Sequence, residues 1–371
     1  RWIMQRKFTR REFLKTTGYA ASSIALTGCG RQMLGDTALH SSAKAEKPVV
    51  SVVRIKSDKI DYAVRESIDL LGGIDTIMAN KERIMLKPNL VSPDPRDTTN
   101  PQVTEALARL MLESKKDVSI GEGSAAAGPN IGANGVCRTK DTDVLNEIQR
   151  SVFNNLGYTE LSKKIHIPLV NLHTGEMRTV ANPNGFVFKE ISLHRSLTDT
   201  DLLCSVPMMK THGLAGVTLG MKNLIGVYPG QVYGTVRSAV HTEASKIEES
   251  GTASAIVDMV QVNKLGLVVI DASMAMQGQG PSVRQGGQLV RMDLIIAGTN
   301  PLAADMTAAY IMGFQPEEIS TFSFAWKAGM TPKSMDEIEV RGTQVDSVKK
   351  SFNRPTIYPW GALKDWWGLP C

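Results

Sequence analysis

Short apolar runs rich in β-branched residues alternate with amphipathic stretches from Pro48 onward. In Ile60–Leu71, apolar residues recur at a helical spacing and Gly72-Gly73 follows, which is typical of a helix and its end. Strands are predicted at Val49–Ile55, Arg83–Leu86, Asp117–Ile120, Asp201–Val206, Leu265–Ile270 and Asp293–Ala297. Helices are predicted at Ile60–Leu71, Pro101–Leu112, Asp141–Leu156, Val236–Glu248, Thr252–Val262, Pro301–Met312 and Pro316–Ala328.

This order of elements defines the expected fold class. Strands that are apolar along their whole length are typical of a sheet covered on both faces, and alternation with helices favours parallel pairing. Residues 177–192 alternate around Asn182-Pro183-Asn184-Gly185 and predict a β-hairpin. We therefore expect an α/β fold, a mostly parallel sheet with helices on both faces, plus a β-hairpin insertion.

The first 29 residues have the pattern of an export signal. Arg10-Arg11 precedes Phe13-Leu14-Lys15, and an uncharged apolar run follows up to Thr27. That run is too short to span a bilayer as a helix, but it suits a twin-arginine signal peptide. The other interpretation is a surface helix with a basic start. We expect Met4 to be the first residue of the precursor.

The signal ends in Leu26-Thr27-Gly28-Cys29, which resembles a bacterial lipobox. We expect lipidation at Cys29, with simple cleavage of the signal as the open alternative. Residues 30–47 are small, polar and charged, and they predict a flexible tether. The expected location is the periplasmic side of the cell envelope, with the twin-arginine translocase and the membrane as partners.

Charge and cysteine content exclude two classes of function. Residues 1–28 hold six of the 42 basic residues and one of the 37 acidic ones, so the remainder has 36 of each. That balance gives no support to a nucleic-acid partner. The four cysteines form no C-x-x-C pair, so no iron–sulfur cluster is expected. We expect Cys204 to be buried, and pairing of Cys137 with Cys371 stays open.

Polar residues and glycines gather where the predicted strands end, and in open α/β sheets ligands bind beyond the carboxyl ends of the strands. The segments concerned are Lys87-Pro88-Asn89, Gly121-Glu122-Gly123, Lys210-Thr211-His212, Asp271 with Gly278–Pro281, and Asn300–Asp305. We predict that Lys87, Glu122, Lys210, His212, Lys222 and Asp271 converge on one pocket.

Several of these segments together resemble domain-of-unknown-function family 362. The resemblance rests on Leu86–Val91, Gly121-Glu122-Gly123, Val206–His212, Gly220–Gly226, Asp271 with Gly280-Pro281, and Asn300–Asp305. It implies a single family domain, which we place at residues 48–345. The C-terminal tail at 346–371 is rich in Trp, Pro and Tyr from Ser351 on, and we expect it to pack on this domain. The family description implies a fold and a site but no reaction.

The stretch His212–Lys222 is also similar to part of the nickel-pincer lactate racemases. That similarity implies a catalytic base at His212 and a cofactor attachment point at Lys222, ten residues further on. A second histidine of those enzymes is absent here, because the comparable loop is Gly121-Glu122-Gly123-Ser124. We predict His212, Lys210, Lys222 and Glu122 as catalytic residues, with proton transfer or isomerisation as the chemistry.

The remaining site residues are assigned by their chemistry. Lysines with backbone amides of glycine turns suit a carboxylate or a phosphate. We expect substrate binding by Lys87, Asn89, Asn223, Gly121, Gly123 and Gly280. Asp271 and Asp305 are the candidate ligands of a divalent metal. The cofactor stays open between such a metal and a group loaded before export.

Two functions compete at this point. The first is an envelope enzyme acting on a small anionic substrate. The second is a lipid-anchored protein that binds a ligand or a partner without turnover, which an exposed apolar surface at Trp360, Trp366 and Trp367 would favour.

Overall fold

The computed structural model describes residues 46–125, 131–132, 135–136 and 139–363. The predicted signal, Cys29, the tether up to residue 45, Cys137, Trp366, Trp367 and Cys371 lie outside the described residues. The described residues form one structural unit. No helix in the described ranges is long and apolar enough to cross a membrane.

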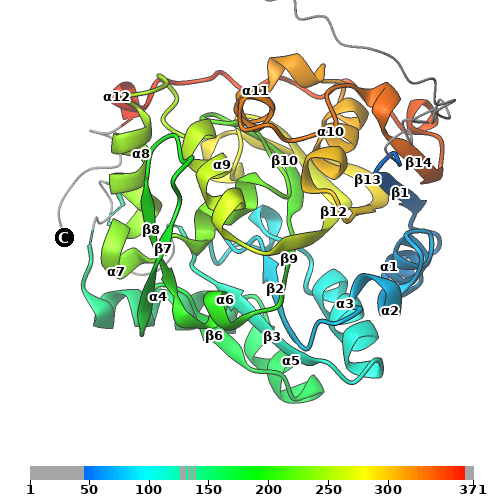
Figure 1. Cartoon of the computed structure of the whole chain (residues 1–371), viewed down its shortest axis with the longest axis horizontal. Coiled ribbons are helices and arrows are strands. Elements are labelled where there is room, and N and C mark those ends of the chain that lie inside the picture. The colour runs from blue at the N-terminus through cyan, green and yellow to red at the C-terminus, as the bar shows by residue number, and fades with distance from the viewer. Residues whose placement is uncertain (1–45, 126–130, 133–134, 137–138, 364–371) are drawn as a thin grey trace, which may run out of the picture. The chain divides into compact units, whose positions relative to one another are not determined.

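Ten strands of the described residues form one twisted sheet (Figure 1). Its main path runs β14 (Glu339–Gly342), β1 (Val49–Arg54), β13 (Gly287–Gly298), β12 (Leu265–Gly278), β9 (Leu202–Val206), β2 (Arg83–Pro88), β3 (Asp117–Glu122) and β6 (Leu169–Asn171). Neighbours are parallel except at β13, which is antiparallel to both β1 and β12. The prediction of a mostly parallel sheet is confirmed.

Helices cover both faces of this sheet, as expected (Figure 1). Along β2, Ile84 and Leu86 belong to one apolar cluster and Met85 to the other, because successive side chains of a strand point to opposite faces. The first cluster contains residues of α1 (Ile60–Asp69), α3 (Pro101–Glu113), α4 (Thr142–Asn155) and α5 (Tyr158–Ile165). The second contains residues of α9 (Ala253–Val262), α10 (Pro301–Ile311) and α11 (Ser320–Lys327).

The shorter helices lie in the connections. They are α2 (Ile74–Ile77), α6 (Arg195–Asp199), α7 (Gly230–Tyr233), α8 (Ser238–Ala244) and α12 (Trp360–Leu363). The predicted hairpin is present as β7 (Met177–Ala181) and β8 (Glu190–His194). Cys204 is completely buried in β9, as predicted.

An extension of the sheet was not predicted and carries part of the site. After Pro207 the chain continues from β9 directly into β10 (Met208–His212), which pairs in parallel with the second half of β12. The chain then turns back as β11 (Gly216–Thr218), antiparallel to β10. β12 and β13 are longer than the predicted strands Leu265–Ile270 and Asp293–Ala297. Charged residues such as Asp271 and Arg291 interrupt the apolar runs, but pairing continues beyond them as far as Gln277 and Gln288.

The helix predicted at Val236–Glu248 is also shorter than expected. Val236 and Arg237 have φ angles of 51° and 56°, in the left-handed region, so α8 begins only at Ser238.

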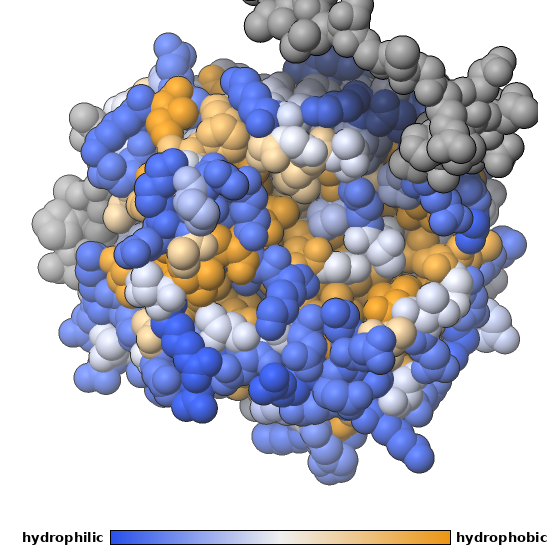
Figure 2. Space-filling view, viewed as in Figure 1, coloured by the Kyte–Doolittle hydropathy of each residue, from blue (hydrophilic) through white to orange (hydrophobic). Residues whose placement is uncertain are grey.

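In Figure 2, polar residues form most of the visible surface and apolar residues show mainly toward the middle of that face. Phe352 and Trp360 of the predicted tail are buried.

Candidate functional site

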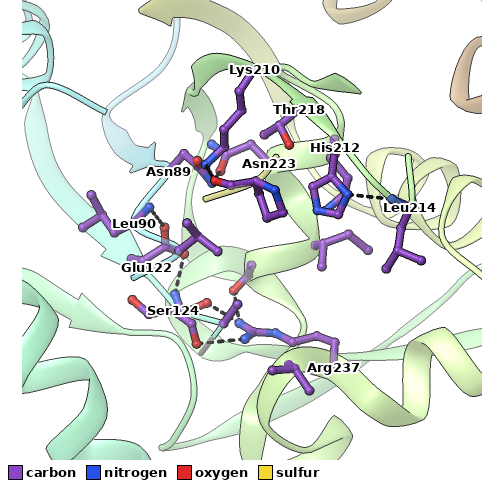
Figure 3. Close-up of a pocket in the computed structure, with 18 of the residues that line it drawn as sticks. Asn89, Leu90, Glu122, Ser124, Lys210, His212, Leu214, Thr218, Asn223 and Arg237 are labelled. Carbon is purple, nitrogen blue, oxygen red and sulfur yellow. Dashed lines mark hydrogen bonds between the residues drawn. The ribbon is translucent and has the colours of Figure 1, made fainter. Parts of the chain in front are cut away.

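A cavity of about 80 Å³ lies beyond the carboxyl ends of β2 and β3, bordered by β10 and the start of α8 (Figure 3). In the same measure one water molecule needs about 10–15 Å³, so the space suits several waters or one small ligand. It is lined by Lys87, Asn89, Glu122, Gly123, Ser124, Lys210, His212, Leu214, Thr218, Lys222, Asn223, Gly226, Arg237, His241 and Trp360, among others. Eight of the predicted site residues are among them.

Lys87 and Glu122 form a buried ion pair at the ends of β2 and β3. The distance from Lys87 Nζ to Glu122 Oε1 is 2.8 Å, and both side chains are at most 2% exposed. Lys87 also donates to Asn223 Oδ1 and to the carbonyl of Pro88, each at 3.0 Å. Burial lowers the pKa of Lys87, while Glu122 acts against that shift. The pair is held because two parallel strands end side by side.

Backbone donors fix the carboxylate of Glu122. The N–H of Gly123 donates to Oε1 at 2.7 Å and the N–H of Leu90 donates to Oε2 at 2.8 Å. A Cβ atom on Gly226 would lie 2.7 Å from both Glu122 Oε1 and Lys87 Nζ, so only glycine permits this close approach. Because both of its carboxylate oxygens accept hydrogen bonds from the backbone, Glu122 is held in a fixed position, where it orients Lys87 and forms part of the cavity wall.

Two further lysines lie in this cavity. Lys210, on β10, donates to the carbonyls of Asp97 at 2.6 Å and Pro281 at 3.3 Å. Lys222 begins the 3-10 helix η3 (Lys222–Val227), and its side-chain amine has no hydrogen bond or ion pair within the described part of the chain. Burial lowers the pKa of each lysine to about 7, and in each case a neighbouring cation adds to the shift. Both amines can therefore change protonation state near neutral pH.

Arg237 is a site residue that the sequence did not reveal. Its guanidinium donates to the carbonyls of Gly123, Ser124, Gly226 and Tyr228. Burial lowers its pKa to about 10, so it remains a cation near neutral pH. No motif marked it, because it falls inside a stretch that reads as an ordinary amphipathic helix.

The backbone beside Arg237 is strained. Val236 and Arg237 both line the cavity and both have left-handed backbone angles, which a β-branched residue such as valine rarely adopts. Such strain amounts to about 1–3 kcal/mol per residue and is found most often at functional sites.

Three polar side-chain atoms on the cavity wall are buried without a hydrogen-bond partner in the described residues. They are Asn89 Oδ1, Ser124 Oγ and Thr218 Oγ1. Leaving such an atom unpaired is unfavourable by about 1–3 kcal/mol, so buried polar atoms normally have partners. These three atoms are almost fully enclosed within the wall, so their hydrogen-bonding capacity is unused in this arrangement of the side chains.

The hydrogen bonding of His212 bears on the role that the racemase resemblance implies for it. The N–H of Leu214 donates to His212 Nδ1 at 3.0 Å (Figure 3). A ring nitrogen that accepts a bond carries no proton, so the neutral ring carries its proton on Nε2. Burial and the cations Lys222 and Lys210 hold the pKa of His212 well below its usual value. In this state Nε2 is a hydrogen-bond donor and not a base.

Four predicted site residues do not line the cavity. Gly121 packs against Met85, where a Cβ atom would lie 2.5 Å from the sulfur, and Gly280 borders a neighbouring groove. The carboxylate of Asp271 accepts from the N–H groups of Asn100 and Ser273 and from the hydroxyl of Ser273. The prediction that Asp271 joins the pocket is therefore wrong.

Asp305 holds the chain just before η3. Its two oxygens accept from the N–H groups of Gly220 at 2.7 Å and Met221 at 2.8 Å. Burial raises its pKa to about 7. The described residues contain no group of three or more His, Cys, Asp or Glu side chains that could hold a metal ion. Asp271 and Asp305 lie apart from the cavity, and their oxygens are occupied by backbone donors.

The balance of charge shows which ligands the cavity suits. Lys87, Lys210, Lys222 and Arg237 are four cationic groups, and Glu122 is the one carboxylate among the described lining residues. Like charges in a partly buried space repel, and a bound anion relieves that repulsion. The fold and the site therefore define an α/β protein with a cavity lined mainly by cationic side chains at the carboxyl edge of its sheet.

The chain belongs to the domain-of-unknown-function family 362, whose family model matches residues 84–310. This confirms the resemblance read from the sequence. A thylakoid-associated protein of Synechocystis sp. is 25% identical over 277 residues, which are 74% of this chain and 76% of that protein.

Two solved structures share 13% sequence identity with the chain. The lactate racemase apoprotein of Thermoanaerobacterium thermosaccharolyticum has a TM-score of 0.42 over 72% of this chain and 57% of its own. A structural-genomics protein of Thermotoga maritima has a TM-score of 0.39 over 69% of this chain and 58% of its own. The chain spans less than two thirds of the length of either structure.

Proposed function

We propose that the protein is an enzyme that binds a small substrate with a carboxylate or phosphate group in this cavity and catalyses a proton transfer to or from that substrate. The observation that carries the proposal is the cluster of four cationic groups around a cavity whose described lining residues include a single carboxylate. The alternative, a binding or assembly protein without turnover, would be favoured by an exposed apolar surface that includes Trp360. Trp360 is buried and does not contribute to such a surface.

The cavity suits proton transfer for an electrostatic reason. Removing a proton from a carbon next to a carboxylate places a second negative charge on the substrate, and preorganised cations stabilise that charge best where water is excluded. Lys210 and Lys222, with pKa values of about 7, can be cationic in one step and neutral in the next. Lys87, tied to Glu122, stays fixed and orients the anion.

We expect Lys222→Met to remove most of the stabilisation that an anion gives the protein. At pH 6.5 the amine of Lys222 is largely protonated and free to pair with the ligand, so the variant loses its strongest unshared cation. The measurement is the melting temperature of the parent and of the variant, without sulfate and at a series of increasing sulfate concentrations. Lys163→Met is the matched control, because Lys163 is an exposed lysine away from the cavity.

A sulfate response that is the same in the parent, Lys222→Met and Lys163→Met would contradict anion binding in this cavity. Binding without turnover of any small acid would favour the non-catalytic alternative.

The amine of Lys222 also fits a covalently attached cofactor, since it lines the cavity and is unpaired among the described residues. Such a group would add electrophilic chemistry, and the intact mass of natively produced protein, compared with Lys222→Ala, detects it.

We also propose that the protein is exported by the twin-arginine translocase and anchored in the envelope through Cys29. The support is the sequence pattern around Arg10-Arg11 and Leu26–Cys29. Replacing Arg10 and Arg11 by lysine is expected to leave the precursor in the cytoplasm, which cell fractionation measures. Cys29→Ala is expected to be exported but released from membranes. Full membrane association of Cys29→Ala would contradict the lipid anchor.

A further inference from the structure

A second histidine, His241 on α8, lines the same cavity as His212. Neither the sequence motifs nor the family resemblance assigned it a role. His241 is also among the neighbouring groups that lower the pKa of His212. What each ring can do depends on which of its nitrogens carries the proton, and in both rings the backbone fixes this.

The tautomer of His241 is opposite to that of His212. His241 Nδ1 lies 2.7 Å from the carbonyl oxygen of Gly251, which can only accept, so Nδ1 must carry the proton. The hydroxyl of Thr252, 3.3 Å away, donates to the carbonyl of Ser250 and is therefore free to accept from Nδ1 as well. The neutral ring of His241 consequently has an unprotonated Nε2.

Trp360 holds the ring of His241 in place. The two rings stack with centroids 4.7 Å apart and planes inclined by 27°. The indole Nε1 of Trp360 donates to Thr242 Oγ1 on the same helix, α8, at 3.2 Å. Together with the bond to Gly251, this contact restricts both the tilt and the rotation of the imidazole.

Both Nε2 atoms remain available to a ligand. Neither has a hydrogen-bond partner among the described residues, and neither is one of the fully enclosed unpaired atoms, so each has accessible surface. Burial lowers the pKa of His241 to about 3 and that of His212 well below its usual value, so both rings are neutral. The cavity thus presents one imidazole donor, His212, and one imidazole acceptor, His241.

We propose that His241 is the proton acceptor of the reaction and that His212 is a neutral hydrogen-bond donor to the substrate oxygen. This rests on the proposed function and assigns the roles within it. The C–H bond next to the substrate's carboxyl group breaks, and its proton goes to His241 Nε2. The electron pair moves into the substrate as an enolate, whose oxygen accepts from His212 Nε2–H and from a lysine. A proton delivered by the ammonium of Lys210 or Lys222 to the opposite face of that carbon completes an isomerisation without any change in oxidation state, and transfer of the proton on His241 to the neutral amine restores both groups.

The first test reads the tautomers directly. In the full chain with ¹⁵N-labelled histidine, long-range ¹H–¹⁵N spectra distinguish protonated from unprotonated ring nitrogens. At pH 7.5 we expect a protonated Nδ1 and free Nε2 for His241, and the reverse for His212. His241→Asn and His212→Asn assign the signals, and His166→Asn, at an exposed helix end, is the control. A protonated Nε2 on His241, or a free Nε2 on His212, overturns the proposal.

The second test uses sulfate as the probe, because an anion distinguishes a donor from an acceptor. His212→Leu is expected to weaken sulfate binding about fivefold or more, because one hydrogen bond to a charged ligand is lost. His241→Leu is expected to leave the binding unchanged or to tighten it, since an unprotonated nitrogen repels an anion. Equal weakening by both overturns the assignment of roles. If the tautomers are as expected but the parent binds no sulfate, the proposed function fails and the tautomer assignment stands. If sulfate binds but the tautomers are reversed, this inference alone fails.

Discussion

Glu122→Gln is expected to lower the free energy of unfolding by about 3–5 kcal/mol, because it leaves the buried ammonium of Lys87 without its counter-charge. Lys87 and Glu122 are 1% and 2% exposed, so water cannot replace the lost carboxylate. Glutamine also places an amide N–H₂ where one of the backbone donors, Gly123 or Leu90, needs an acceptor. The measurement is urea denaturation at pH 7.5, followed by circular dichroism.

A matched control separates burial from pairing. Lys163 and Glu160 form an ion pair at a similar distance, 2.7 Å, but their side chains are 67% and 77% exposed. Glu160→Gln is expected to leave the free energy of unfolding unchanged within error, because solvent screens exposed pairs. In the double variant Lys87→Met/Glu122→Gln, part of the stability should return. A Glu122→Gln protein as stable as the Glu160→Gln protein would show that the pair is not buried as described.

The second large effect is expected in the pH dependence of anion binding. Sulfate keeps its charge between pH 6 and 9, so any change in its affinity there reports on the protein. Lys210 and Lys222 have pKa values of about 7 in the free protein, and a bound anion favours their charged forms. Above pH 7 each must take up a proton before the complex forms. The affinity should therefore fall about tenfold per pH unit for each lysine that pairs with sulfate.

The same shift predicts how stability changes without an anion. The folded-state pKa of both lysines is lower than the value of 10.5 that they have when unfolded. Between pH 7 and 10.5 the unfolded chain binds more protons, so these two groups make the free energy of unfolding rise with pH across that window. Below pH 7 both states are protonated, and the contribution no longer changes.

Calorimetric titrations with sulfate at pH 6, 7, 8 and 9 check the predicted pH dependence of sulfate affinity. The proton uptake should appear as a dependence of the measured heat on the buffer used. Lys222→Met should lower the slope of log affinity against pH by about one, and Lys163→Met should not change it. An affinity that is flat from pH 6 to 9 would contradict the low pKa values of these lysines.

The sequence by itself determined the fold class, because apolar periodicity depends on local spacing. It predicted strands such as β9 and helices such as α10 close to their observed bounds. It also brought together Lys87, Glu122, Lys210, His212 and Lys222, since the ends of neighbouring parallel strands meet at one edge. The family followed from the same motifs.

Only the tertiary structure decided which polar residues face the cavity. Asp271 follows the pattern of the others, yet backbone donors of Asn100 and Ser273 hold it outside the cavity. Arg237 and His241 enter the site because the chain turns through left-handed angles before α8, and no motif announces that turn.

The protonation pattern of the two histidines was equally beyond the sequence. Whether a ring nitrogen meets an N–H, as in His212, or a carbonyl, as in His241, depends on backbone groups at Leu214 and Gly251. Hydrophobic periodicity selects elements through many similar contacts that add up along the chain. Tautomers and charge pairs depend on single contacts between distant or non-repeating positions, and these exist only once the fold has formed.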